Sequence, residues 1–179
     1  MVTAVCFASR AYDVVLCEKD TERYKLLQKG IPPFYEPGLD SLLKRAVDSG
    51  RLRVSTCAKD AVNNSEAIFI AVGTPSMPDG RIDLTSIQIS CAEVGEALRE
   101  VESYHLIVVR STVIPGTTQG TVKSTIENYS GKSAGRDFGL AMQPEFLREG
   151  SAIEDIFYQS RIVIGEYDKK SGDVLESLY

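Results

Sequence analysis

The chain has 179 residues, of which 43% are hydrophobic, and 20 Lys and Arg against 25 Asp and Glu give a formal net charge of −5. This length is enough for one domain with a real hydrophobic core, and the ordinary apolar content excludes a disordered chain. The mildly acidic balance argues against a general nucleic-acid binder, which needs a basic surface. No apolar run approaches the ~20 residues of a membrane span, and no basic segment precedes the apolar start, so we expect a cytoplasmic protein.

The cysteines and the single histidine do not form a metal-binding pattern. The four cysteines are widely spaced without a C-x-x-C pair, and His105 is predicted to be a loop residue that enters a strand. Without a secretion signal, the thiols are expected to be reduced and buried. Cys6 and Cys17 lie in apolar runs and are predicted to be small core residues.

Short apolar runs predict the strands of a parallel sheet. The runs are continuous rather than alternating, which is typical of strands that are buried on both faces. In chain order they are Val14–Cys17, Ala67–Val72, Leu106–Val109, Leu140–Met142 and Ile162–Ile164.

Amphipathic helices are predicted between these strands. Asp20 is placed to cap a helix that runs to about Lys29, and Gly30 would end it. A second helix follows the i, i+3, i+4 pattern over 39–47, and a third covers 84–98 behind a capping Asp83. Alternating strands and helices indicate an α/β fold with a doubly wound, mostly parallel, Rossmann-like sheet.

Ligands of doubly wound sheets bind outside the carboxyl ends of the strands, so residues that follow a strand are candidate site residues. Glu18 follows the first predicted strand, where an acidic residue can bind adenosine ribose hydroxyls and repel the 2′-phosphate of NADP. Gly73 and Thr74 follow the second, where a glycine lets a ligand approach the backbone. Ser111 and Thr112 follow the third and suit a polar ligand. Turn formation and helix capping would also explain each of these residues taken singly.

Two carboxylates follow the fourth predicted strand. Glu145 and Glu149 are four residues apart, so they would share one face if the segment were helical. Two like charges at that distance would repel, and the raised pKa of one would suit a general base that activates water. Two solvated carboxylates around Arg148 are the alternative.

Four motifs together resemble the UDP-glucose/GDP-mannose dehydrogenase family, specifically its NAD-binding domain. They are Tyr35–Leu39, Ala71–Pro75, Ser111–Val113 and Pro144–Gly150, in this order and with similar spacing over essentially the whole chain. The resemblance implies a four-electron oxidation in which two NAD convert the C6 hydroxyl of a nucleotide sugar to a carboxylate through a cysteine thioester. UDP-glucose, giving UDP-glucuronate, is the expected sugar and GDP-mannose the alternative. The resemblance further implies homo-oligomers among full-length members, whereas the composition already argues against a nucleic-acid or membrane partner.

The resemblance also implies roles for particular residues. The cofactor-binding residues would be Glu18, Arg23, Gly73, Thr74, Thr112 and Glu149. The catalytic residues would be Thr112, Glu145, which activates the hydrolytic water, and Glu149, which lies beside nicotinamide and substrate. The substrate-binding residues would be Glu145, Phe146, Leu147, Arg148 and Glu149. No metal is implied.

The chain departs from the family pattern at both ends. The first strand and its G-x-G-x-x-G turn are missing, and the chain starts inside the following helix, near Met1–Val5. The central helix and the substrate domain, which carry the catalytic cysteine, would lie beyond Tyr179. We therefore expect residues 1–179 to be an incomplete NAD-binding domain without its first strand, marginally stable and inactive alone.

Two other classes of protein remain open. A non-catalytic, degenerate Rossmann module that pairs with a partner chain would explain the missing glycines and cysteine. A hydroxy-acid dehydrogenase would explain the sheet but not the Glu145–Gly150 motif.

Overall fold

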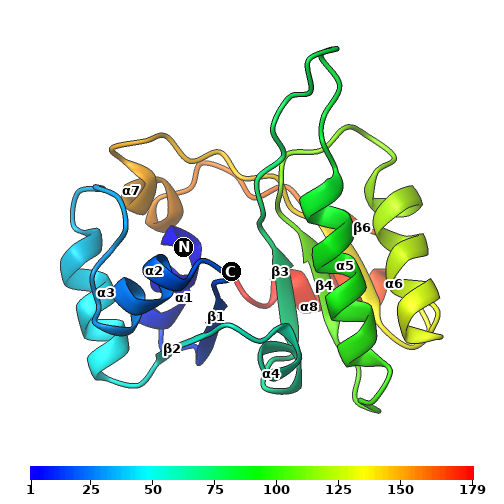
Figure 1. Ribbon diagram of the computed structural model, residues 1–179, viewed down its shortest axis with the longest axis horizontal. Helices are drawn as coiled ribbons and strands as arrows, with labels where there is room; N and C mark the ends of the chain where they lie inside the picture. Colours follow the sequence, from blue (N-terminus) through cyan, green and yellow to red (C-terminus); the bar gives the residue numbers. More distant parts are fainter. The chain divides into compact units, whose positions relative to one another are not determined.

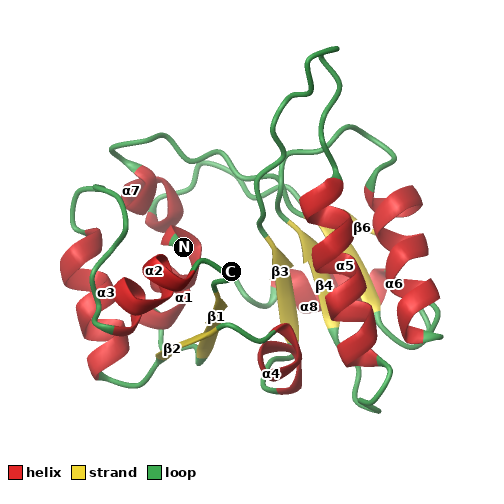
Figure 2. Ribbon diagram, in the orientation of Figure 1, coloured by secondary structure: helices red, strands yellow, loops and turns green.

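Six strands form two separate sheets in the computed structural model, which describes residues 1–179. The helices and strands divide between two units (Figure 2). The first unit combines Met1–Asn64 with Phe146–Arg161, and the second combines Ser65–Glu145 with Ile162–Tyr179. No helix in either unit is both long enough and apolar enough to cross a bilayer.

The first unit contains five helices and a two-stranded sheet. In chain order its elements are α1 (Val2–Ser9), β1 (Val14–Cys17), α2 (Thr21–Gln28), α3 (Leu39–Asp48), β2 (Leu52–Ser55), α4 (Ala58–Asn63) and α7 (Ala152–Phe157). The strands are parallel, with Val14 opposite Leu52 and Cys17 opposite Ser55. Because the strands are parallel, the carboxyl ends of both lie at the same edge of the sheet.

Helices supply most of the first unit's core. α1 packs against α3, α7 and β1. The buried side chains are mainly aliphatic, and most of them come from these three helices: Val2, Val5, Cys6, Ala8, Leu27, Leu39, Leu43, Ala46, Leu52, Ala152 and Ile156. α3 is an example of an amphipathic helix. Leu39, Leu43 and Ala46 lie on its buried face, whereas Asp40 and Lys44 are exposed.

The second unit is built around a four-stranded sheet. Its elements are β3 (Ala67–Ile70), α5 (Thr85–Leu98), β4 (Leu106–Val109), the π-helix η1 (Thr118–Val122), α6 (Lys123–Ser130), β5 (Gly139–Met142), β6 (Gly165–Glu166) and α8 (Lys169–Glu176). The order is β3-β4-β5-β6, with β3, β4 and β5 parallel and β6 antiparallel to β5.

Both faces of the second sheet are covered. α5 and α6 lie on one face and α8 on the other (Figure 1). Leu175 of α8 packs with Leu106 and Val108 of β4, and α5 packs against β3. β4 is central, and all four of its residues are fully buried. Burial on both faces therefore explains why its sequence is continuously apolar.

Several predicted elements are confirmed. Asp20 caps α2 by accepting the N–H of Arg23 at 2.8 Å, and Gly30 follows the helix with a φ of +71°. Asp83 accepts the N–H of Thr85 at 2.8 Å at the start of α5, although the N-cap position itself is occupied by Leu84. His105 stands directly before β4, as expected.

Other predictions were wrong. The run Ile162–Ile164 is not a strand, because β6 comprises only Gly165–Glu166. β2 was missed, since Arg53 and Ser55 interrupt its apolar pattern. None of the four cysteines forms a disulfide, but Cys17 is exposed rather than in the core, because it is the last residue of β1 and lies at the sheet's carboxyl edge. Cys57, directly before α4, is also exposed.

Candidate functional site

The carboxyl end of β1 carries the first predicted cofactor residue. Glu18 follows β1 directly, and its backbone N–H donates to Ser55 at 2.9 Å, which continues the ladder with β2. The Glu18 carboxylate accepts the N–H of Asp20 at 2.9 Å and is half-buried. A carboxylate in this place fits the ribose hydroxyls of a dinucleotide.

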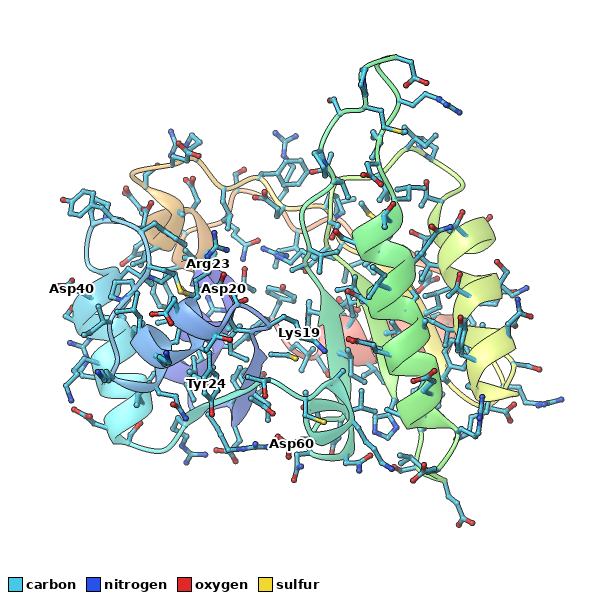
Figure 3. The ribbon with its side chains drawn as sticks, in the orientation of Figure 1. Lys19, Asp20, Arg23, Tyr24, Asp40 and Asp60 are labelled. Carbon is cyan, nitrogen blue, oxygen red and sulfur yellow. The ribbon has the colours of Figure 1, made fainter.

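Arg23 lies in the first turn of α2, five residues after Glu18. Figure 3 shows Arg23 and Asp20 together at the amino-terminal end of α2. The Arg23 backbone donates to Asp20 Oδ1 at 2.8 Å, so the cap fixes the backbone that carries the guanidinium. Asp20 thus links the two residues that were predicted to meet the adenosine ribose: its backbone N–H donates to the Glu18 carboxylate, and its own carboxylate accepts the N–H of Arg23.

Hydroxyl groups join the carboxyl ends of β3 and β4 in the second unit. Thr74 Oγ1 donates to the carbonyl oxygen of Thr112 at 2.8 Å, so these two predicted residues lie together. Ser111 Oγ donates to the carbonyl oxygen of Val72 at 2.7 Å. A Cβ placed on Gly73 would meet no other atom within 4 Å, which leaves open space beside the backbone for a ligand. This geometry fits a polar cofactor at the strand ends.

A buried polar network follows β4 and β5, and sequence reasoning gave it no role. Arg110 Nη1 donates to Gln143 Oε1 at 2.6 Å, and the Tyr179 hydroxyl donates to the same oxygen at 2.8 Å. Arg110 is 8% exposed and Gln143 1% exposed. Both stand directly after a strand, and that position was the available signal. The network fixes the two strand ends from which Thr112 and Glu145 continue.

The segment after β5 corrects the expectation for the two carboxylates. Residues 143–148 are not helical, and α7 begins only at Ala152. A spacing of four therefore does not place Glu145 and Glu149 on one helix face. The absence of a helix is consistent with Pro144, which disfavours a helical backbone at Gln143 before it.

The predicted substrate-binding residues of the first unit differ in their environment. Phe146 is 56% exposed, and the Arg161 guanidinium lies 5.8 Å from its ring centroid. Leu147 is half-buried and packs against the core of the first unit. Glu149 is exposed. Phe146 and Glu149 are thus accessible to a ligand, whereas Leu147 anchors the segment.

Arg148 is held by Asp155 of α7. Its backbone N–H donates to Asp155 Oδ2 at 2.8 Å, and its Nη2 lies 2.7 Å from Asp155 Oδ1. The Arg148 guanidinium and backbone N–H lower the pKa of the Asp155 carboxyl below its ordinary value. The ion pair with Asp155 thus fixes Arg148, the middle residue of the segment Phe146–Gly150.

Glu36 fixes the same segment at its end, and sequence reasoning assigned it no role. It lies between α2 and α3, inside the Tyr35–Leu39 motif, and accepts the N–H groups of Gly150 at 2.9 Å and Ala152 at 2.8 Å. The motif itself was the available signal, but nothing local identifies its bonding partners. No group of three or more His, Cys, Asp or Glu side chains is placed to hold a metal ion.

The whole chain, residues 1–179, matches the UDP-glucose/GDP-mannose dehydrogenase family, NAD binding domain. A GDP-mannose 6-dehydrogenase from Pseudomonas savastanoi pv. phaseolicola is 45% identical over 178 residues, which cover 99% of this chain and 41% of the relative. A UDP-glucose 6-dehydrogenase from Haloferax volcanii is 38% identical over 176 residues, covering 98% and 40%. The chain thus spans about two fifths of the length of these relatives.

Solved structures agree with the fold. A ternary complex of GDP-mannose dehydrogenase from Pseudomonas aeruginosa has a TM-score of 0.98 and 45% identity, covering 99% of this chain and 41% of that one. A UDP-glucose dehydrogenase from Pyrobaculum islandicum has a TM-score of 0.95 and 43% identity, covering 99% and 40%. The predicted α/β Rossmann-like fold with mostly parallel strands is confirmed.

Proposed function

The chain belongs to the UDP-glucose/GDP-mannose dehydrogenase family, whose members are NAD-dependent oxidoreductases, and we propose that it is the NAD-binding part of a longer enzyme. That enzyme would oxidise the C6 hydroxyl of a nucleotide sugar to a carboxylate with two NAD. The observation that carries the proposal is the match of the whole chain to the family's NAD-binding domain, joined to polar strand ends that fit a dinucleotide.

We propose that the predicted cofactor residues bind NAD. NAD, when bound, accepts the hydride from the substrate carbon. Glu18 would accept hydrogen bonds from the adenosine ribose hydroxyls, and its charge would exclude a 2′-phosphate. Arg23 would lie on the same ribose. Thr74 and Thr112, whose segments are joined at 2.8 Å, would present hydroxyl groups to the cofactor from a fixed backbone.

We further propose that Glu145 takes a proton from the hydrolytic water, so that hydroxide character develops on the oxygen that attacks the acyl carbon. Phe146, Arg148 and Glu149 would position the nucleotide sugar beside it, with Leu147 holding the segment on the core. The Asp155 contacts support this role because they pre-organise the backbone at Arg148.

The sugar is proposed as GDP-mannose or UDP-glucose. The 45% sequence identity to a GDP-mannose 6-dehydrogenase favours GDP-mannose. The identity to a UDP-glucose dehydrogenase of known structure is nearly as high, at 43%. Steady-state turnover of each nucleotide sugar by the full-length protein separates the two, since the ratio of kcat/KM values measures the preference.

Two substitutions in the full-length protein test the roles. Glu145→Gln should lower kcat by about 10²–10⁴-fold, because a general base is removed.

Glu18→Gln should raise the KM for NAD and reduce the ratio of the kcat/KM values for NAD and NADP. Glu22 is an exposed acidic residue on α2, so the control Glu22→Gln should change neither quantity. Absence of turnover with either sugar, despite a folded protein, would contradict the proposal and favour a non-catalytic module.

A further inference from the structure

Glu36 is the only acidic side chain that the fold buries, with 6% of it exposed. Burying a carboxylate is costly unless hydrogen bonds compensate for the lost water. Here each carboxylate oxygen accepts one backbone N–H: Oε2 from Gly150 and Oε1 from Ala152. The burial is thus matched by two charge-assisted hydrogen bonds to one short stretch of backbone.

The two donors are groups that the chain would otherwise leave without acceptors. Ala152 is the first residue of α7, and the N–H groups of a first helical turn have no partner within the helix. Ser151, at the N-cap position, makes no side-chain cap. Glu36 therefore supplies the missing cap from a residue more than 110 positions earlier in the chain.

The same contact determines where the preceding segment ends. Gly150 has a φ of +86°, so the backbone turns sharply between Glu149 and α7. Asp155 fixes Arg148 on one side of this turn, and Glu36 fixes Gly150 and Ala152 on the other. The exposed Glu149 lies between the two attachment points.

We infer that Glu36 is a positioning residue for nucleotide-sugar binding: it sets the conformation of Phe146–Gly150 by capping α7 from the Tyr35–Leu39 motif. The inference rests on the proposed function, because it takes Phe146–Gly150 as the substrate-binding segment. Glu36 itself does not touch the substrate. Each of its carboxylate oxygens accepts one backbone N–H, from Gly150 at the end of the segment and from Ala152 at the start of α7.

The test uses Glu36→Gln in the full-length protein, with Glu154→Gln as the matched control. Glutamine keeps the size of the side chain but replaces one acceptor with an N–H donor, which faces a backbone N–H. Glu154 lies in the first turn of α7 and is exposed, so its substitution removes a charge from the same helix end but leaves both hydrogen bonds of Glu36 in place. Glu36→Asp, which keeps the charge but is one methylene shorter, provides a second variant with partial capping.

Hydrogen exchange is the first readout. Glu36→Gln should accelerate amide exchange at Gly150 and Ala152 by about tenfold or more, because the cap to a charged group is lost. Amides of β1 and β2 should keep their rates, and Glu36→Asp should be intermediate. Unchanged exchange at both amides, or equal acceleration throughout the first unit, would overturn the inference.

Kinetics supply the second readout. Glu36→Gln should raise the KM for the nucleotide sugar about tenfold while the KM for NAD stays within about twofold, with partial recovery in Glu36→Asp. Accelerated exchange with an unchanged sugar KM would overturn the positioning role. A wild-type protein that turns over no nucleotide sugar would instead contradict the proposed function, and exchange would still measure the cap.

Discussion

β1 and β4 look alike in sequence but occupy different environments. Both are four-residue apolar strands, Val14–Cys17 and Leu106–Val109. β4 pairs with strands on both sides and all four residues are fully buried, whereas β1 pairs only with β2 and none of its residues is fully buried. An apolar run therefore predicts a strand, but the number of strands that pair with it determines how much of its surface is buried.

The difference extends to how each unit is stabilised. A two-stranded sheet is marginal in water, so the first unit depends on α1 and α3, which pack against the sheet, and on α7, which packs against α1. The second unit has a central strand between two helical layers. We therefore expect core substitutions in its sheet to cost more than equivalent substitutions in β1.

The largest expected effect is at β4. Ile107→Ala removes a fully buried side chain and should lower the free energy of unfolding by about 2–5 kcal/mol. Leu16→Ala in β1 removes a half-buried side chain and should cost only about 1 kcal/mol. Urea unfolding measures both. Equal losses would show that β1 is as central to stability as β4.

Helix caps give the next effect. Asp168 caps α8 by accepting the Ser171 N–H at 3.0 Å, and it also accepts the Ser171 hydroxyl at 2.6 Å. Ser171 is fully buried, and its oxygen accepts the N–H of Leu140 in β5. Asp20 only caps α2, at the surface.

Asp168→Ala should therefore cost about 2–3 kcal/mol, because a buried hydroxyl loses its acceptor as well as the helix its cap. Asp20→Ala should cost about 1 kcal/mol. Thermal unfolding measures both, and Asp168→Asn serves as the control that keeps a capping oxygen. A larger loss for Asp20→Ala would reverse the comparison between the units.

The difference between strands with two neighbours and strands with one also explains which strands could be predicted from the sequence. Strands with two neighbours, such as Leu106–Val109, were predictable because burial on both faces leaves a continuous apolar run. β2 was not, because only Leu52 and Val54 of its four residues are apolar, and such an alternation is too short to recognise. Cys17 belongs to an apolar run, yet chain order alone does not show that the strand ends at the sheet edge there.

The positions of the candidate residues after their strands were predictable segment by segment, but their long-range contacts were not. Motifs identified Glu18, Thr74 and Thr112, and each follows a strand as expected. The helical interpretation of the Glu145–Glu149 segment failed because α7 starts only at Ala152, where Glu36 caps it from far earlier in the chain. Such a hydrogen bond leaves no local periodicity, so a single sequence does not reveal it.

The native cysteines allow the unfolding of each unit to be followed by thiol labelling, without any substitution. Burial raises the pKa of Cys91 in the second unit to about 12 and that of Cys6 in the first to about 11. At pH 8, iodoacetamide should label the exposed Cys17 and Cys57 readily, and the two buried thiols more than about tenfold more slowly. Mass spectrometry in increasing urea should show Cys6 reacting before Cys91, since the first unit has the weaker sheet. The opposite order would contradict that ranking.

The same thiols make stability depend on alkaline pH. Their folded pKa values lie above the ordinary 9.0, so the unfolded thiols lose protons first as the pH rises. Their stabilisation is complete below about pH 9 and is lost as the pH rises toward 11 and 12. Unfolding midpoints at pH 8 and pH 10 measure this decline, and Cys91→Ala should reduce it.

The smallest effects concern one ion pair in each unit. The Arg136 guanidinium, followed by the Ser133 N–H, lowers the pKa of Asp137 in the second unit to about 2, and Arg148 lowers that of Asp155 in the first. A lowered pKa means that the unfolded carboxyl takes up its proton first as the pH falls. The stabilisation is therefore present above the ordinary value of 3.8 and lost as the pH falls through about 2 for Asp137.

Carboxyl chemical shifts followed by NMR from pH 6 to pH 2 measure both titrations. Arg136→Gln should return the pKa of Asp137 toward its ordinary value without moving that of Asp155, because each arginine acts on its own carboxylate. Arg148→Gln should do the converse and should also accelerate exchange of the residue 148 amide, since Asp155 then holds only the backbone N–H. If Arg136→Gln shifted both titrations, the two ion pairs would be electrostatically coupled, which would contradict this expectation.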